Sequence, residues 1–310
     1  MTLPWDVIGI GATSVDYVYR LPVLPEADGP HAKIRISSHN VSCGGQTATA
    51  LATCASLGLR SKFAGILGSD ENGRRIHDEL LRRGIDVADA HVHDGPNQFA
   101  AILVDERTGE RIVLWSRDEG LALKPDELSP ELLASARIVH VDDVDQEGAI
   151  RAATRARQSG AIVTSDIDRV TDRTEELVGA VSIPILAEHV PSALTGERDM
   201  EGALRKLRAR HATMLCVTLG RAGAMILDGD VLYHEPAFSV DAVDTTGAGD
   251  VFRGAFIYGL LRGERPRALL RFANAAAAVS CTRPGAIDAV PALDDVVRML
   301  DSRTLEAPKV

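Results

Sequence analysis

The chain has 310 residues, of which 45% are hydrophobic and 25% are charged, and its formal net charge is −10. This composition is typical of a soluble globular protein, and the length suits one large α/β domain or two small ones. The net negative charge argues against a nucleic-acid binder, because a phosphate backbone requires a basic surface. We find no run long and apolar enough to predict a membrane span.

The N-terminal residues Met1 to Asp6 lead directly into a strand-like run without a basic region, so we expect no signal peptide. The four cysteines are scattered and show no C-x-x-C spacing, which favours buried free thiols: Cys43, Cys54, Cys216 and Cys281. A reducing, cytoplasmic location is the expectation.

In chain order, short apolar runs bounded by polar residues or glycine predict buried strands at 7–12, 63–67, 138–141, 161–164 and 215–219. Helical patterns lie between several of them and stop at a glycine, at 46–57, 73–83 and 147–159. Alternating strands and helices indicate a mainly parallel sheet covered on both faces. With no repeat, low-complexity tract or long linker, residues 1–310 are predicted to form a single domain.

Two regions break this alternation. Residues 31–42 and 99–115 resemble strands without crossover helices, and the polar stretch from Asp105 to Gly109 suits a hairpin turn. We interpret them as a small β lid, inserted at about 13–43 and 96–117, although ordinary surface hairpins have the same pattern. A lid would exclude water from a reaction, and its exposed edge favours a homodimer formed through it.

The first strand is followed by Gly9-Ile10-Gly11-Ala12, which is similar to a dinucleotide fingerprint but lacks its third glycine. Residues 20–30 contain three prolines where that fold requires a helix, which argues against a dehydrogenase. The glycines instead deliver Asp16 to the carboxyl end of a strand, where a carboxylate accepts hydrogen bonds from two hydroxyl groups of a ligand. A solvated loop aspartate is the alternative.

Farther along, two glycines open a helix that starts near Asp250 and runs on through apolar residues to Leu261. Amides at Gly247, Ala248 and Gly249 are then available to hold a phosphate oxygen at the helix N-terminus. Asp250, beside them, is suited to removing a proton from an attacking hydroxyl group. A capping aspartate after a tight turn would give the same pattern.

The full string Asp244-Thr245-Thr246-Gly247-Ala248-Gly249-Asp250 resembles the signature of the ribokinase (PfkB) family of carbohydrate kinases. The resemblance implies a ribokinase-like three-layer α/β sandwich with a β-sheet lid and ATP-dependent phosphorylation of a sugar hydroxyl group. By the same resemblance Asp250 is the catalytic base, residues 247–249 form the anion hole, and Asp244 and Thr246 lie near a monovalent-cation site for K⁺.

Other segments resemble the family in the same order along the chain. On the sugar side, the implied contacts are Asp16 and the glycine pair Gly44 and Gly45, with Asn40 close by in sequence. On the nucleotide side, they are Thr218, Gly220 and Arg221 after a strand, and Asn274 and Ala277 on a helix beside adenine. Arg221 is equally well explained as a solvated turn residue. The segment 281–286 resembles the cation-binding loop, and Asp70 is predicted to cap a helix.

One departure concerns the metal. The family's Asn-x-x-Glu motif is replaced by Ala187-Glu188-His189-Val190. Glu188 is then the residue expected to contact Mg²⁺, through a water molecule. The ketohexokinase branch departs similarly, and the stretch ending at Arg117 and Asp118 resembles its lid strand. Arg117 would then contact the substrate, a ketose such as fructose, unless it only pairs with Asp118.

Three alternatives stay open from the sequence. The chain could be a nucleoside kinase of the same family, or a kinase of a phosphorylated sugar. The latter needs a basic cluster near the lid, for which the sequence offers Lys33, Arg35, Arg111 and Arg117. A sugar-sensing protein without turnover is the third alternative, which retention of Asp250 disfavours.

Overall fold

A computed structural model describes residues 3–108, 110–210 and 214–305. Its central layer begins with four parallel strands in the order β10-β9-β1-β4. These strands are β1 (Trp5–Ile10), β4 (Ser61–Phe63), β9 (Ala136–Asp142) and β10 (Ile162–Asp166). Buried valine and isoleucine side chains dominate them, as expected of strands covered on both faces.

Isolated bridges, Thr164 to Ile183 and Ile167 to Leu186, connect this sheet to a second one with the order β11-β12-β13-β14. The second sheet has one parallel pair and then turns antiparallel at its far edge. Its strands are β11 (Ile185–Ala187), β12 (Leu215–Thr218), β13 (Ala224–Asp228) and β14 (Val231–Glu235). The expected mainly parallel sheet is confirmed.

Helices pack on both faces of this layer, around two separate apolar cores. One core contains Leu51, Phe256 and Leu270, and the other contains Ala153, Leu177 and Leu204. The helices of the first core are α1 (Gln46–Ser56), α2 (Glu71–Arg82), α8 (Ala248–Leu261), α9 (Pro266–Cys281) and α10 (Leu293–Leu305). Those of the second are α3 (Pro130–Ala134), α4 (Gln146–Gln158), α5 (Thr174–Ala180), α6 (His189–Thr195) and α7 (Met200–Arg210).

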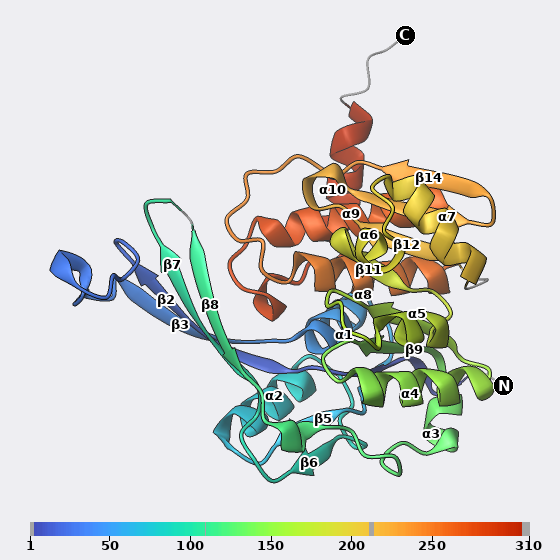
Figure 1. The fold of residues 1–310 in the computed structure, drawn as a ribbon, viewed down its shortest axis with the longest axis horizontal. Helices are drawn as coiled ribbons and strands as arrows, with labels where there is room; N and C mark the ends of the chain where they lie inside the picture. The colour runs from blue at the N-terminus through green and yellow to red at the C-terminus, as the bar shows by residue number, and fades with distance from the viewer. Residues whose placement is uncertain (1–2, 109, 211–213, 306–310) are drawn as a thin grey trace.

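A separate four-stranded sheet projects from one side of this body (Figure 1). It contains β2 (Ser14–Leu21), β3 (Ser38–Gly44), β7 (Phe99–Asp105) and β8 (Arg111–Ser116) in the order β3-β2-β7-β8. We call these four strands the lid sheet. Strand β2 pairs parallel with β7, and the other two pairs are antiparallel. Gly109, at the predicted hairpin turn, lies outside the described residues.

The predicted element boundaries hold in part. The three predicted helices end at Gly58, Gly84 and Gly160, each with a positive φ. The Asp70 side chain caps α2, as predicted, by accepting from the Gly73 amide at 2.9 Å.

Two predicted strands differ from the structure. The strand predicted at 63–67 is wrong as a single unit, because it divides into β4 and β5 (Ile66–Gly68), and β5 pairs with β6 (His91–His93). The strand predicted at 31–42 begins only at Ser38.

Gly65 lies at the division of 63–67. A Cβ atom there would lie 2.6 Å from Phe63 Cζ and 3.1 Å from the Gly11 carbonyl oxygen, so a larger residue would crowd both neighbours. All four cysteines are free, and Cys43, Cys54 and Cys216 are buried as predicted, whereas Cys281 is only half-buried. None of the helices in the described part of the chain is both long and apolar enough to cross a membrane.

Candidate active site

A cleft of about 480 Å³ lies between the lid sheet and the carboxyl ends of the central strands. This volume is in the range typical of small-molecule sites. Asp16 of β2 and Trp115 of β8 line its lid side, while Asp166 at the end of β10 and Asp250 on α8 line its floor. The lid sheet and the central sheet therefore contribute to one site, although their strands are not paired with each other.

The floor of the cleft includes the N-terminus of α8. Gly247 is the N-cap residue with φ +76°, a left-handed conformation that favours glycine, and its carbonyl accepts from the Val251 amide at 2.9 Å. The Asp244 carboxylate holds the preceding loop by accepting from the amides of Thr246, at 2.9 Å, and Gly285, at 3.0 Å. The entrance to α8 is thus held in place, and within it the Ala248 amide donates to the Thr245 carbonyl at 3.3 Å.

Asp250 lies in this first helical turn and faces the cleft. Burial raises the pKa of its carboxyl to about 7, although the Arg253 guanidinium and a hydrogen bond with Asp166 oppose the shift. A group that titrates near neutrality is well matched to removing a proton from a hydroxyl group and releasing it later. The catalytic-base role of Asp250 stays a prediction.

Sequence reasoning missed the partners of Asp250. Arg253 Nη2 lies 2.7 Å from Asp166 Oδ1, and the two side chains are 5% and 2% exposed. Two signals were available. An arginine inside an otherwise apolar helix must find a buried partner, and an aspartate at the carboxyl end of a central strand points to the ligand edge of the sheet.

The predicted sugar-side residues gather around Asp16. Asp16 is buried and accepts from the Ser14 hydroxyl at 2.9 Å, and burial raises its pKa. Gly45 caps α1 with φ +98° and lines the cleft, whereas a Cβ atom on Gly44 would come within 2.8 Å of Asp16 Oδ2. Glycine at these two positions therefore leaves room for Asp16 and for the tight entrance to α1.

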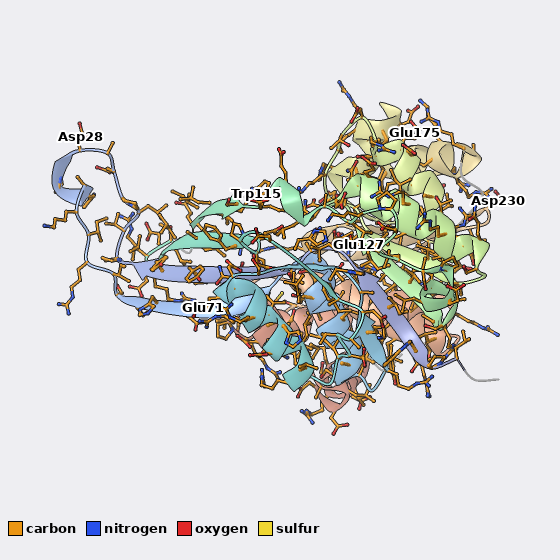
Figure 2. The ribbon with its side chains drawn as sticks, turned by 90° about the horizontal axis from the view of Figure 1, so that it is seen from below. Asp28, Glu71, Trp115, Glu127, Glu175 and Asp230 are labelled. Atoms are coloured by element: carbon orange, nitrogen blue, oxygen red, sulfur yellow. The ribbon has the colours of Figure 1, made fainter. Side chains whose placement is uncertain are left out.

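Two contacts link the lid sheet to the floor of the cleft. At one end of β8, Arg111 Nη1 donates to the Thr246 hydroxyl at 2.7 Å and lies 3.8 Å from Asp244 Oδ1. At the other end, the Arg169 guanidinium lies 5.0 Å from the centre of the Trp115 ring, which Figure 2 shows on the lid sheet. Trp115 and Arg169 were not anticipated from the sequence.

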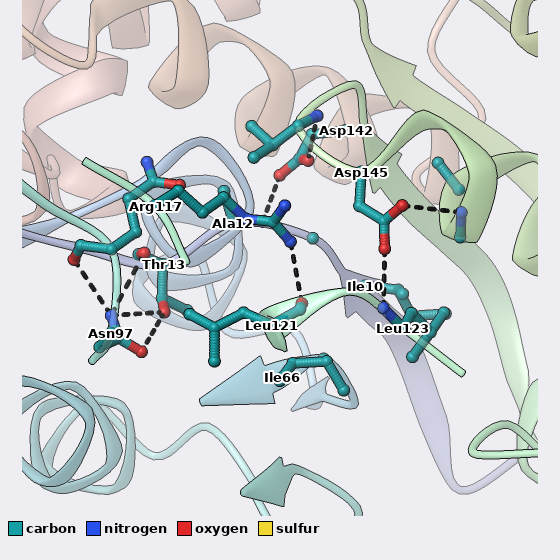
Figure 3. A pocket seen from close by; sticks show the side chains of 16 residues that line it. Ile10, Ala12, Thr13, Ile66, Asn97, Arg117, Leu121, Leu123, Asp142 and Asp145 are labelled. Carbon is teal, nitrogen blue, oxygen red and sulfur yellow. Dashed lines mark hydrogen bonds between the residues drawn. The ribbon is translucent and has the colours of Figure 1, made fainter. Parts of the chain in front are cut away.

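Arg117 is placed elsewhere. It lines a small cavity of about 30 Å³ that shares Ala12, Gln98 and Val144 with the cleft, and its Nη2 donates to the Leu121 carbonyl at 2.9 Å (Figure 3). Asn40, the other residue predicted near the sugar, is exposed on β3 and does not line the cleft.

The predicted nucleotide-side residues follow the edge of the second sheet. Thr218, at the end of β12, lines the cleft, and Gly220 and Arg221 form the short turn after it. On α9, Asn274 Nδ2 donates to the Glu235 carbonyl at 2.8 Å, and Ala277 packs against the core. The cleft-lining set therefore includes Thr218 but not the two residues of α9.

The described residues contain no group of three or more histidine, cysteine, aspartate or glutamate side chains that could hold a metal ion. Glu188 is exposed, and it directly follows Ala187, which lines the cleft. A divalent cation at this site would therefore need most of its ligands from a bound nucleotide and water.

Comparison with known proteins extends this picture. Residues 7–293 match the family model described as pfkB family carbohydrate kinase. The chain is 30% identical over 300 residues to an ATP-dependent ribose-1-phosphate kinase of Halopiger xanaduensis, covering 96% of this chain and 98% of the relative. It is 27% identical to fructokinase-1 of Zea mays over 323 residues, covering 95% and 97% of the two chains.

The same fold occurs in the crystal structure of a ribokinase from Thermotoga maritima. The TM-score is 0.82 at 27% sequence identity, and the superposition covers 96% of this chain and 99% of the other. The ribokinase-like α/β architecture expected from the sequence is confirmed.

Proposed function

Since the chain belongs to the PfkB family of carbohydrate kinases, we propose that it transfers the γ-phosphoryl group of ATP to a hydroxyl group of a small sugar, with Asp250 as the general base. The observation that carries this proposal is the position of Asp250 in the cleft, in the first turn of α8 and beside the glycine amides. Its pKa near 7 supports the assignment.

In the proposed reaction, Asp16 accepts hydrogen bonds from sugar hydroxyl groups and orients the acceptor toward Asp250. Asp250 takes the proton of the attacking hydroxyl group as its oxygen bonds to phosphorus and the bond to the ADP oxygen breaks. The amides of Gly247, Ala248 and Gly249 stabilise the charge that develops on the transferred group. The products are a sugar phosphate and ADP.

We place the nucleotide along Thr218, Gly220 and Arg221, with Asn274 and Ala277 on the adenine side. Mg²⁺ bound with ATP would neutralise phosphate charge, and we assign Glu188, an exposed residue next to the cleft-lining Ala187, to contact it through water. We also propose a K⁺ site at Asp244 and Thr246. Its support is that the Asp244 carboxylate joins Thr246 to Gly285, which brings the two predicted cation-binding segments into contact.

A second candidate function, phosphorylation of a sugar that already bears an acidic group, has a specific observation in its favour. Arg111 and Arg169 both line the cleft on the side of the lid sheet. Among the described residues the Arg169 guanidinium forms no ion pair within 4.0 Å, and only its backbone amide donates to the Asp143 carboxylate, at 2.5 Å, so the guanidinium can also meet a ligand oxyanion. The relative from Halopiger xanaduensis acts on ribose 1-phosphate, a substrate of this kind.

We further propose that the lid sheet covers the acceptor during turnover and that two copies of the chain associate through it. Strand β8 lies at the edge of the sheet, and its four consecutive apolar residues Ile112, Val113, Leu114 and Trp115 are exposed. An uncovered apolar edge strand is an association site.

The experiment that tests the proposed function is a coupled ADP-release assay with ketoses, aldoses, nucleosides and sugar phosphates, with and without K⁺. We expect turnover with at least one sugar, and a comparison of neutral with phosphorylated acceptors separates the two candidate functions. In the second case, Arg169→Gln should raise the KM for the acidic sugar while leaving the KM for ATP unchanged. ATP binding without turnover on any acceptor would favour the sugar-sensing alternative.

A further inference from the structure

Among the residues that the structure describes, three arginine side chains line the cleft: Arg111, Arg169 and Arg253. Arg111 donates to the Thr246 hydroxyl and Arg169 lies against the Trp115 ring, so both are engaged at the lid sheet. Arg253 instead belongs to α8, the helix whose first turn forms the predicted anion hole, and it lies about one turn further along. This arginine has no role in the reaction described so far.

The guanidinium of Arg253 packs against the first turn of α8. A Cβ atom on Gly249 would lie 2.7 Å from Arg253 Nη1, which is closer than real Cβ contacts allow. Glycine at this position thus leaves the space that the guanidinium occupies. The Arg253 side chain is only 5% exposed and still lines the cleft, so the part of it that a ligand can reach lies beside the predicted anion hole.

Arg253 has hydrogen-bonding capacity that the described residues do not use. Its Nη2 lies 2.7 Å from Asp166 Oδ1, but this oxygen has no hydrogen-bond partner, so the contact is an ion pair without hydrogen-bond alignment. The buried Nε of Arg253 has no hydrogen-bond partner either. A guanidinium carries five N–H donors in a planar fork that suits phosphate oxygens, and buried donors without a partner are costly. The unused donors therefore indicate an anionic ligand.

The charges in the cleft require a cation at this place. Four carboxyl groups line the cleft, those of Asp16, Asp166, Asp168 and Asp250. They repel a phosphoryl group, and the N-terminus of a helix opposes this repulsion with only about half a unit of positive charge. Arg253 is the side chain on the same helix that can supply a full positive charge to a ligand held at the amides.

We propose that Arg253 is a further catalytic residue, and that its guanidinium contacts the transferred phosphoryl group beside the amides of residues 247–249. In bound ATP it donates to the γ-phosphoryl oxygens, and its charge offsets the negative charge that develops during transfer. Asp166 holds the guanidinium through the ion pair. The inference rests on the proposed function, because it assigns a group that acts in the same reaction.

A purely structural role for Arg253 is the competing explanation. The Asp166 side chain is 2% exposed, and its carboxylate would be left without a cation if Arg253 were removed. A loss of activity in Arg253→Met alone would then have two causes, a missing phosphoryl contact or an uncompensated buried charge. Asp166→Asn separates these causes, because it removes the charge and preserves the shape of the side chain.

The kinetic test is a double-mutant cycle at the two positions. Replacement of Arg253 by methionine should lower kcat about 10²-fold in the wild type and again in the Asp166→Asn background, the usual cost of losing one donor to a developing oxyanion. If the double variant keeps kcat within about threefold of Asp166→Asn, Arg253 only balances Asp166 and the proposal is overturned. The double variant lacks the uncompensated carboxylate, so this comparison stays available if Arg253→Met alone does not fold.

A binding measurement tests the contact without turnover. Calorimetry with ATP and with ADP, each with Mg²⁺ and without sugar, gives the affinity that the γ-phosphoryl group adds. Arg253→Met should lower the ratio of ATP affinity to ADP affinity about tenfold, because ADP lacks the contacted group. A folded variant with an unchanged ratio would contradict a contact between Arg253 and the phosphoryl group.

Lys62→Met is the matched control. Lys62 is also a buried cation, paired with Asp86 at 2.5 Å and with Asp89, but it lies on β4 and does not line the cleft. Its removal should lower the thermal stability while kcat and the ratio of ATP to ADP affinity stay unchanged. Equal changes of both quantities in Lys62→Met and Arg253→Met would assign the effect to lost stability and overturn the proposal.

The two readouts separate failure of this inference from failure of the proposed function. A protein whose ratio of ATP to ADP affinity depends on Arg253, but which phosphorylates no acceptor, would refute the proposed reaction and retain the phosphoryl contact. An active enzyme in which neither kcat nor the affinity ratio responds to Arg253→Met would refute the role of Arg253 alone.

Discussion

Gly247 offers the sharpest test of how the anion hole is built. Its φ of +76° costs an alanine about 1–2 kcal/mol of backbone strain. A Cβ atom would also lie 2.8 Å from Ala286 Cβ and 2.9 Å from Ala286 Cα, and overpacking of this kind costs about 1–3 kcal/mol more. Because the contact includes backbone, the strain is not relieved by rotation of a side chain, and the loop that precedes α8 must shift.

Gly247→Ala should therefore lower both stability and catalysis. Loss of one well-placed anion-hole donor lowers kcat by about 10²–10³-fold, and we expect a reduction of at least tenfold for a partial displacement. Thermal unfolding and the coupled ADP-release assay measure the two effects on the same preparation.

Gly263→Ala is the control at the opposite end of the same helix. Gly263 has nearly the same φ, +72°, but nothing lies within 4 Å of a Cβ atom there. It should lose about 1 kcal/mol of stability from backbone strain and keep wild-type kcat. A folded Gly247→Ala enzyme with wild-type kcat would refute the assignment of the anion hole to this helix N-terminus.

Three further outcomes are expected. The pKa of Asp250 is raised to about 7, so its carboxyl group is mostly protonated and inactive as a base below that pH. The kcat/KM should therefore rise with pH through about 7. A profile that is flat from pH 5 to 8 would contradict this assignment. Trp115→Ala removes the ring beneath Arg169 and should lower kcat/KM about tenfold, as measured by initial-rate kinetics. Calorimetry should show a Tm within a few degrees of the wild type. Leu114→Asp places a charge on the exposed edge strand, where Leu114 is 58% exposed, and should convert a dimer into a monomer in light scattering; an unchanged mass would argue against association through the lid sheet.

Local signals predicted much of this molecule. The glycine stops of the helices and the Asp70 cap depend on adjacent residues and need no knowledge of distant parts of the chain. The glycines of the string from Asp244 to Asp250 likewise predict a turn and a helix start. The Gly285 amide, which holds this loop through Asp244, comes from a distant segment that the string does not reveal.

The missing features depend on pairing between distant segments. Arg253 and Asp166 meet only because α8 packs against β10, and the pattern of either segment alone does not reveal its partner. Similarly, the parallel pairing of β2 with β7 builds the lid sheet from segments far apart in the sequence. The position of Arg117 in the small cavity, rather than the cleft, follows from its bond to the Leu121 carbonyl after the chain leaves β8.

The central claim is that Asp250 removes the proton from the attacking sugar hydroxyl group, and Asp250→Asn tests it most directly. The amide preserves the shape of the side chain but cannot accept that proton at neutral pH. Sugar and ATP binding, measured by calorimetry, should survive, while kcat falls by about 10²–10⁴-fold, the usual contribution of general base catalysis. Equal ATP turnover by Asp250→Asn and the wild type, with an acceptor that both proteins bind, would contradict the account.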